Sequence, residues 1–173
     1  MSINNLISKI VPPDHPRYTG TEQMWSDIEA EFGIRFPNDY KDYINTYGPG
    51  DFLNSFSVVS PFGPQNHTVM TELSMYRKYG EAIREVFPIY PEKNGLLYWG
   101  GGEDGISCWW LTRGEPFNWP IVLISDAALE IRIYKRSMTS FIVDFITGKI
   151  RLDFFGENAR INFSQNNIFN PWL

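Results

Sequence analysis

Cys108 is the only cysteine of the sequence and the first candidate for a catalytic nucleophile. A reactive thiolate needs a histidine or another positive charge beside it. His15 lies in a proline-rich stretch and His67 at the expected start of a helix, and neither forms a motif with Cys108. In the strand expected here, Cys108 shares a face with Ile106 and Trp110. We therefore expect a buried structural cysteine, and an enzyme that uses Cys108 stays open only as a third hypothesis.

The glycine run Gly100–Gly102 does not fit a cofactor motif, and the carboxylates do not fit a metal motif. A P-loop continues into Gly-Lys-Ser/Thr and a dinucleotide-binding loop joins a strand to a helix, whereas strands are expected on both sides of these glycines. Asp39 and Asp42 are separated by Lys41 and no histidine accompanies them, while metal ligands normally cluster. We predict a hairpin turn, a solvated helix face, no cofactor and no metal.

Acidic side chains offer a different chemistry, the binding of a basic surface. Glu103 and Asp104 follow the glycines, and Asp51 and Glu72 are further acidic candidates. On a loop, such carboxylates can imitate the phosphates of a nucleic acid and cover a basic cleft. The alternative is a solvated turn, because Gly and Asp form turns for conformational reasons alone.

The adjacent tryptophans Trp109 and Trp110 supply a further candidate contact. Neighbouring residues of a strand point to opposite faces, so one of the two belongs to the core. The other could be an exposed anchor for a partner, since tryptophan is enriched among residues that dominate binding. Trp109 is the candidate for this role. The alternative is that a helix layer or the C-terminal tail covers it.

Four helices are expected from capping residues and apolar spacing. The first follows a proline-rich loop, with Thr19 and Glu22 at capping-box spacing and Thr21 as the rival cap. Its apolar face repeats at intervals of 3 and 4 residues, and Gly33 ends it. The other helices are expected from Asn38 to Gly48, over residues 68–84 with an interruption at Gly80, and from the cap Ser137 to Gly148.

Strands dominate the second half of the sequence. In the last of them Leu129, Ile131 and Ile133 share a face that we expect to be covered, and the opposite face should be wetter. The layout predicts one α+β domain over residues 1–173, a mainly antiparallel sheet of about four to six strands with N-terminal helices and a C-terminal helix packed on it. The expected strands span 56–59, 96–99, 106–112, 119–124 and 129–134, with a further short strand at 150–154.

Charge and composition exclude several classes of function. The formal net charge is −5. Phosphate-backbone binding needs a dense basic patch, and the nearest group, Arg132, Lys135 and Arg136, is sparse. No apolar run approaches the roughly 20 residues of a membrane helix, and the N-terminus lacks the pattern of a signal peptide. We expect a cytoplasmic protein that binds neither nucleic acid nor membranes, and whose acidity suits a basic partner or serves solubility alone.

A set of short segments forms a pattern that extends over most of the sequence. Its members are Trp25–Gly33, Phe36–Lys41, Tyr47–Gly48, Val58–Pro61, Trp99–Gly100, Gly105–Leu111, Trp119–Val122, and Ser137 followed by Phe141. In this order and spacing they resemble the SUKH superfamily, which includes fungal cell-wall-assembly regulators and many bacterial immunity proteins. The family-like core covers about residues 20–147, and residues 148–173 form a C-terminal extension. Glu103-Asp104-Gly105 stands near an acidic Gly-Asp-type step of the family, displaced by the additional glycines.

The resemblance implies an α+β domain without enzymatic activity that binds another protein. Bacterial members typically neutralise a cognate toxin by binding its toxin domain in the cytoplasm, and such toxins are often nucleases or nucleic-acid deaminases with basic surfaces. An immunity protein is therefore the first hypothesis. A regulatory or scaffold protein of the same fold, which binds a cellular partner, is the second. Neither the partner's identity nor the oligomeric state follows from the sequence.

Overall fold

The computed structural model describes residues 3–52, 56–64, 66–102, 105–125, 130–150 and 169–172 of the chain. Its helices are α1 (Ile3–Ile7), α2 (Glu22–Phe32), α3 (Asn38–Tyr47), α4 (Val69–Tyr79), α5 (Glu81–Val86), the 3-10 turn η1 (Pro116–Asn118) and α6 (Met138–Ile146). Its strands are β1 (Gly50–Phe52), β2 (Phe56–Val58), β3 (Leu96–Gly102), β4 (Ile106–Leu111), β5 (Ile121–Ser125), β6 (Glu130–Tyr134) and β7 (Phe169–Pro171).

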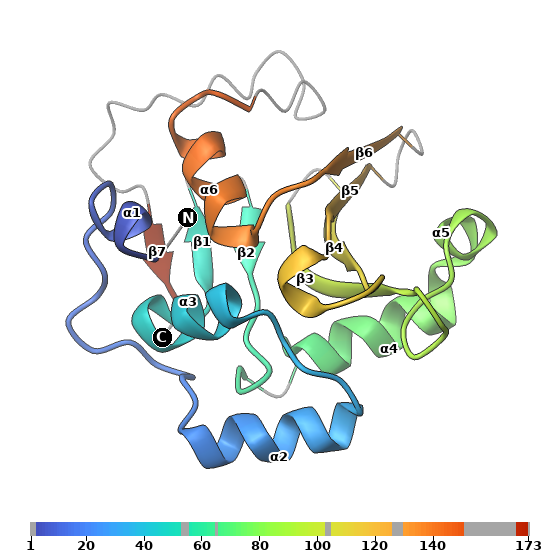
Figure 1. Ribbon diagram of the computed structural model, residues 1–173, viewed down its shortest axis with the longest axis horizontal. Helices are drawn as coiled ribbons and strands as arrows, with labels where there is room; N and C mark the ends of the chain where they lie inside the picture. The colour runs from blue at the N-terminus through green and yellow to red at the C-terminus, as the bar shows by residue number, and fades with distance from the viewer. Residues whose placement is uncertain are drawn as a thin grey trace.

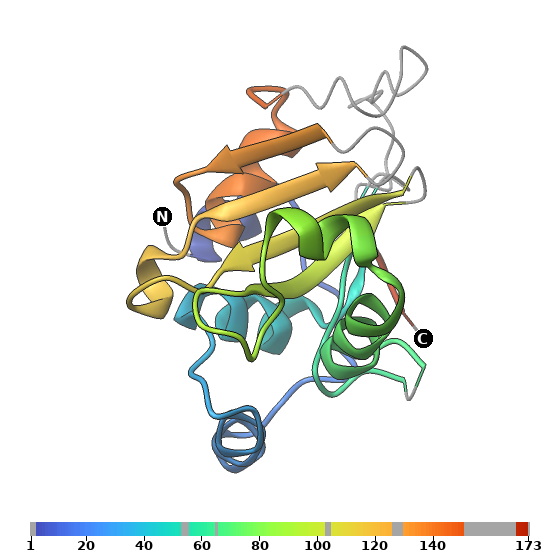
Figure 2. The same ribbon diagram turned by 90° about the vertical axis from the view of Figure 1, so that its right-hand side faces the viewer.

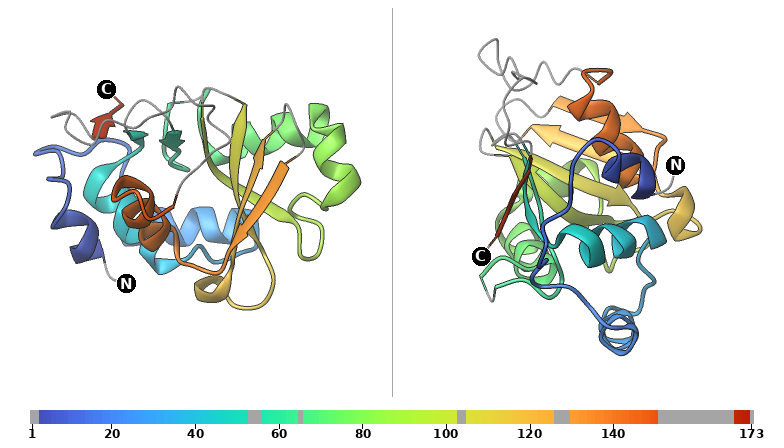
Figure 3. Two further views of the ribbon diagram at one scale, coloured as in Figure 1. Left: turned by 90° about the horizontal axis from the view of Figure 1, so that it is seen from above. Right: turned by 90° about the vertical axis from the view of Figure 1, so that its left-hand side faces the viewer.

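Within the described residues, seven strands form one sheet in the order β6-β5-β4-β3-β2-β1-β7, and all neighbouring pairs are antiparallel. Helices α3 and α6 cover one face of this sheet with α1 packed beside them, and α4 and α5 lie against the other face (Figures 1 and 3). Helix α2 lies on the side away from α6 (Figure 1), and its Trp25 and Phe32 are buried in the core. The α+β class is confirmed, and the sheet has slightly more strands than we expected.

Large aromatic side chains fill the layer between the sheet and helices α3 and α6. The ring of Tyr40 on α3 meets the ring of Trp110 on β4 with centroids 4.9 Å apart, and Trp99 on β3 contacts Phe141 on α6 at 6.1 Å. Edge-to-face pairs of this kind add to the free energy of hydrophobic burial. Every residue of α6 is buried, including the polar residues Thr139, Ser140 and Asp144, so the helix is covered all round and not only along the predicted apolar stripe.

Asp39 joins α3 to the start of α6, which corrects its expected role on a solvated helix face. Its Oδ2 accepts hydrogen bonds from the backbone N–H of Thr139 at 3.0 Å and from the Thr139 hydroxyl at 3.1 Å. The first N–H groups of a helix have no acceptor within the helix, so the carboxylate from α3 replaces the missing one. Asp42 is exposed on α3, as expected.

Local sequence signals place several helix ends correctly. Thr21, the rival cap, accepts a hydrogen bond from the first turn of α2, so the predicted capping box at Thr19 is not the one used. Gly80 separates α4 from α5 and divides the single helix expected over residues 68–84. Ser137 caps α6 as predicted, and its hydroxyl accepts from a backbone N–H of the first turn.

Strand β6 forms one edge of the sheet, and its two faces are covered differently from the prediction. The ring of Tyr134 packs against Phe141 of α6 with centroids 5.3 Å apart, so the face expected to be wetter is the one that α6 covers. Ile133, on the other face, is 52% exposed. The layer of α4 and α5 therefore stops short of the end of β6, and Leu129 lies outside the described residues.

Strands β1 and β7, which the sequence did not predict, form the opposite edge. Gly50 pairs with Pro171 and Phe52 with Phe169, so part of the C-terminal extension belongs to the sheet. A Cβ atom on Gly50 would lie 2.5 Å from the Phe169 ring and 2.6 Å from the carbonyl oxygen of Asn170. This close pairing therefore requires glycine. The short strand expected at 150–154 falls almost entirely outside the described residues.

Candidate functional site

Helix α4 is the framework of the candidate site, and its inner face attaches it to the sheet. Thr68 caps the helix and accepts a 3.1 Å hydrogen bond from a backbone N–H of the first turn. Val69 and Leu73 are buried. The next residue of this stripe, Tyr76, places its ring 4.6 Å from the ring of Trp109 on β4. The inner side chains thus fix which side of α4 faces outward.

Trp109 is fully buried under α4, so it is not the exposed contact for which it was a candidate. Its ring lies edge-on to Tyr76 at 4.6 Å and to Tyr98 at 5.1 Å. Trp110 is buried on the opposite face of β4, against Tyr40. Helices cover both faces of this central strand, and for that reason both tryptophans belong to the core.

The outer side of α4 carries a ridge formed by Glu72, Met75 and Tyr79. These residues are spaced by 3 and 4 positions and therefore follow one side of the helix. Met75 is 51% exposed and Tyr79 is 64% exposed, whereas Glu72 is partly buried. Large apolar side chains that are exposed next to one another are typical of a surface that contacts another molecule.

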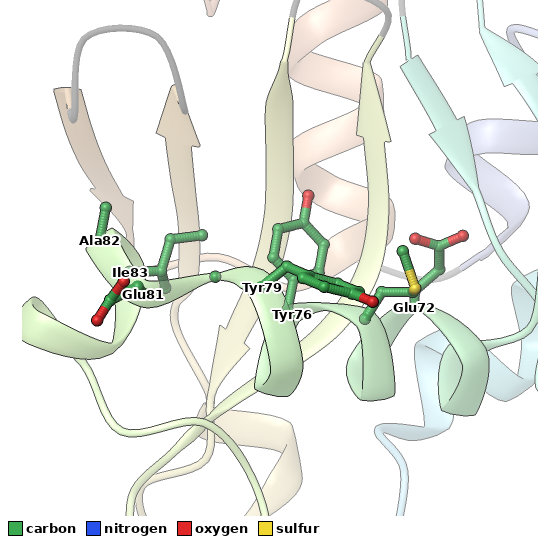
Figure 4. A pocket seen from close by; sticks show the side chains of 8 residues that line it. Glu72, Tyr76, Tyr79, Glu81, Ala82 and Ile83 are labelled. Atoms are coloured by element: carbon green, nitrogen blue, oxygen red, sulfur yellow. The ribbon is translucent and has the colours of Figure 1, made fainter.

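Gly80 turns the chain so that α5 forms a second wall beside this ridge. Its N–H donates to the carbonyl oxygen of Tyr76 at 2.8 Å, and a Cβ atom at this position would lie 2.6 Å from the same oxygen. The turn therefore depends on glycine. The two helices enclose a cavity of about 410 Å³, the α4–α5 groove, which is lined by Glu72, Met75, Tyr76, Tyr79, Gly80, Glu81, Ala82 and Ile83 (Figure 4).

The α4–α5 groove combines an apolar centre with acidic ends. Glu72 and Glu81 lie at opposite ends of the row of lining side chains (Figure 4), and among the described residues no Lys or Arg lines the groove. Arg77, elsewhere on α4, is occupied by a 2.7 Å hydrogen bond from its Nε to a backbone carbonyl oxygen. The Nζ atom of Lys78 lies 4.9 Å from the ring centroid of Tyr79. An apolar centre with polar ends resembles the anatomy of protein–protein contacts.

Asp51 supports the fold at the edge of the sheet. Its Oδ1 accepts from the Ser57 hydroxyl, and its Oδ2 accepts from the indole N–H of Trp172 at 3.1 Å. The Trp172 ring also contacts the ring of His67 at 5.8 Å, and Nδ1 of His67 lies 3.3 Å from Oε1 of Glu72. Asp51 and Glu72 are thus connected through Trp172 and His67, although only Glu72 lines the groove.

Glu103 and Asp104, the other two acidic candidates, lie outside the described residues. The glycine run Gly100–Gly102 does not form the predicted hairpin turn, because its three residues are the end of strand β3 and pair with Cys108, Ser107 and Ile106 of β4.

Cys108 is buried, and burial raises the pKa of its thiol above the ordinary value. A nucleophilic cysteine needs the opposite shift. Its neighbours on the same face of β4 are Ile106 and Trp110, as predicted. Among the described residues, no group of three or more His, Cys, Asp or Glu side chains is placed to hold a metal ion. No helix in the described ranges is long and apolar enough to cross a membrane.

Sequence reasoning missed Met75, Tyr79 and Glu81. The signal was present, because Met75 and Tyr79 are apolar but fall outside the stripe that attaches the helix to the sheet. Apolar residues outside the stripe that packs on the sheet indicate that the helix has more apolar surface than the core covers.

The chain was compared with protein families, curated proteins and solved structures. Residues 22–142, well over half of the chain, match the family model SUKH_6, which is described as SMI1-KNR4 cell-wall. The matched span runs from the start of α2 into α6 and includes the α4–α5 groove. No curated protein and no solved structure matches the chain.

Proposed function

Because the chain belongs to the SMI1-KNR4 cell-wall family (SUKH_6), we propose that it is a non-enzymatic protein-binding domain that acts as an immunity protein. In this role it binds a cognate toxin domain in the cytoplasm and neutralises it. Family membership supports a protein-binding role, of either the immunity type or the regulatory type. The cognate toxin is the more specific part of the proposal.

The observation that carries the proposal is the exposed apolar ridge in the α4–α5 groove. Tyr79 and Met75 present an aromatic ring and a flexible thioether, side chains enriched in the centres of protein interfaces. Because α4 is fixed through Tyr76 and Trp109, this surface is ordered before a partner arrives. Such preorganisation reduces the entropy that binding must overcome.

Charge indicates which kind of partner fits. The described residues that line the groove include Glu72 and Glu81 and no basic side chain, and the whole chain carries a net charge of −5. A partner with Lys or Arg around an apolar patch complements both features, and long-range attraction speeds its encounter. A nuclease or deaminase domain, which must attract nucleic acid, has such a basic surface. Glu103 and Asp104 remain part of the proposal as further acidic contacts.

Neutralisation would follow from occlusion. A stable interface buries on the order of 1,600 Å² in total, far more than the groove alone provides. The exposed parts of α4 and α5 around the groove would therefore share the contact. A domain placed over a basic cleft prevents the nucleic acid from reaching it by both steric and electrostatic exclusion.

The regulatory role is the second candidate, and the description of the matched family as SMI1-KNR4 cell-wall favours it. In that case the same groove would bind a cellular protein and no toxin. Both roles use the same surface chemistry, and the identity of the partner distinguishes them.

The test is co-expression of this chain with the toxin gene encoded beside its own gene. We expect wild type to restore growth and to bind the purified toxin domain in calorimetry. Tyr79→Ala should weaken binding by about 2 kcal/mol, the magnitude of an interface hot spot. Met24→Ala is the matched control, because Met24 is an exposed apolar residue on α2 and lies outside the groove.

The outcomes separate the roles. Loss of rescue in Tyr79→Ala but not in Met24→Ala, with equal free energies of unfolding for both, supports the groove as the contact. Absence of both rescue and binding with wild type contradicts the immunity role. Recovery of a cellular partner whose binding depends on Tyr79 would then establish the regulatory alternative.

A further inference from the structure

A second groove, distinct from the α4–α5 groove, lies at the end of the sheet where β5 begins and β6 ends. The 3-10 turn η1 lies at this end, apart from α4 and α5 (Figure 2). The cavity measures about 490 Å³. We call it the basic groove, and it is lined by Leu111, Arg113, Phe117, Asn118, Trp119, Pro120, Lys135, Arg136 and Ser137.

The basic groove collects positive charge that is dispersed in the sequence. Lys135 and Arg136 follow β6, and Arg113 comes from the loop after β4. These three cations line the groove together, and none of its described lining residues carries a carboxylate. This local charge is opposite in sign to the net charge of −5 carried by the whole chain.

Two of the three cations are available to a ligand. Arg136 pairs with Asp144, which is almost completely buried. The side chains of Arg113 and Lys135 are exposed and form no hydrogen bond or ion pair in the part of the chain that the structure describes. The first turn of α6 offers few free N–H groups to a ligand here, because the N–H of Thr139 already donates to the carboxylate of Asp39.

The floor of the groove is rigid and its rim is aromatic. Trp119 is buried, and its indole N–H donates to the carbonyl oxygen of Gly114 at 2.9 Å. Phe117, on η1, is 74% exposed. A fixed floor, an exposed ring and two unpaired cations form a surface that can hold both a carboxylate and an apolar side chain.

We infer that the basic groove binds an acidic segment of a partner protein, in which carboxylates pair with Arg113 and Lys135 and an apolar side chain packs on Phe117. Charge complementarity selects this occupant. The inference is independent of the toxin proposal, since the α4–α5 groove attracts charge of the opposite sign. The chain would thus carry two binding surfaces of opposite polarity.

A nucleic acid is the weaker alternative. A single strand needs a basic track along several phosphates together with stacking rings, whereas the basic groove offers three cations and the one exposed ring of Phe117. The remainder of an acidic chain repels a long polyanion.

The test measures fluorescence anisotropy with a short fluorescein-labelled peptide in which glutamates flank a central phenylalanine. We expect saturable binding to wild type that weakens as salt is added. Arg113→Glu and Lys135→Glu should each reduce affinity by roughly tenfold or more, and Phe117→Ala should reduce it as well. Lys9→Glu is the matched control, because Lys9 is an exposed cation in the turn after α1 and lies outside this groove.

Any of the following four results would overturn the inference. A peptide with glutamine in place of glutamate that binds equally well would exclude charge recognition. Equal affinity of Arg113→Glu and Lys9→Glu, with unfolding curves like that of wild type, would exclude this groove. Tighter binding of a labelled single-stranded oligonucleotide with the same residue dependence would replace the acidic segment by a nucleic acid. Absence of peptide binding at low salt would contradict the inference directly.

Discussion

The indole N–H of Trp172 donates a 3.1 Å hydrogen bond to Oδ2 of Asp51, a residue 121 positions earlier in the chain. This bond attaches the end of the C-terminal extension to strand β1. The Trp172 ring also contacts His67, just before α4, so the extension reaches the helix that carries the candidate site. Trp172 therefore connects the edge of the sheet with the start of α4.

A double-mutant cycle tests the energetic value of this bond. Asp51→Ala and Trp172→Phe should each destabilise the protein, and together they should do so by less than the sum. We expect a coupling free energy of about 1.5 kcal/mol, since the acceptor is a carboxylate. Urea unfolding measures each value. The control cycle combines Trp172→Phe with Asp42→Ala on α3, and its effects should add within about 0.5 kcal/mol. Equal additivity in both cycles would show that the bond does not stabilise the fold.

Gly48 is expected to tolerate alanine much less well than Gly33, although both glycines end a helix. Gly33 has φ 66° and ψ 29°, a left-handed conformation that costs alanine about 1 kcal/mol. Gly48 has φ 71° and ψ −174°, a region used almost only by glycine, and a Cβ atom there would collide with the carbonyl oxygen of Arg17. Gly48→Ala should therefore lower the free energy of unfolding by at least about 2 kcal/mol more than Gly33→Ala. Similar losses in urea unfolding would contradict this account.

Asp39→Ala should destabilise the protein through α6, although the substitution is made on α3. The carboxylate accepts two hydrogen bonds from Thr139, and loss of a helix cap of this kind costs about 1–2 kcal/mol. Asp42→Ala, one turn away on the same helix and exposed, should change the free energy of unfolding by less than about 0.5 kcal/mol. Hydrogen exchange should be faster at the first amides of α6 in Asp39→Ala only. Equal exchange in both variants would exclude the cap.

Local chemistry explains which parts of the fold could be predicted. Gly33 and Ser137 act on backbone groups within a few residues, so the ends of α2 and α6 follow from nearby sequence. Strand β1 forms a short hairpin with β2 and pairs on its other side with β7, where Gly50 allows Phe169 to approach. The pair of β1 and β7 joins residues that are far apart in the sequence. Pairing at this sequence separation leaves no local pattern.

In the candidate site, too, some features follow from the local sequence and others depend on tertiary packing. Glu72 was predicted as an acidic contact from its charge, and it lines the α4–α5 groove. Trp109 was a candidate because its strand gave no information on which faces helices would cover, and α4 buries it. The ridge of Met75 and Tyr79 required knowledge of which stripe of α4 is already used by the core, and this depends on tertiary packing.

Burial of Cys108 predicts a specific loss of stability at alkaline pH. Burial raises the pKa of its thiol in the folded state, whereas the unfolded thiol ionises near pH 8.5. Below that pH the thiol is protonated in both the folded and the unfolded state, so its contribution to the free energy of unfolding is fully present. As pH rises further, only the unfolded state loses the proton, so the free energy of unfolding should fall by up to about 1.4 kcal/mol per pH unit.

The measurement compares wild type with Cys108→Ala by urea unfolding between about pH 7.5 and 9, where unfolded tyrosines with a pKa near 10 remain mostly protonated. Cys108→Ala is less stable at every pH because it leaves a small cavity, but its free energy of unfolding should fall less steeply as pH rises. The difference in slope isolates the thiol from every other titrating group that the two chains share. Parallel curves would mean that Cys108 ionises in the folded state, which would reopen the possibility that it is reactive.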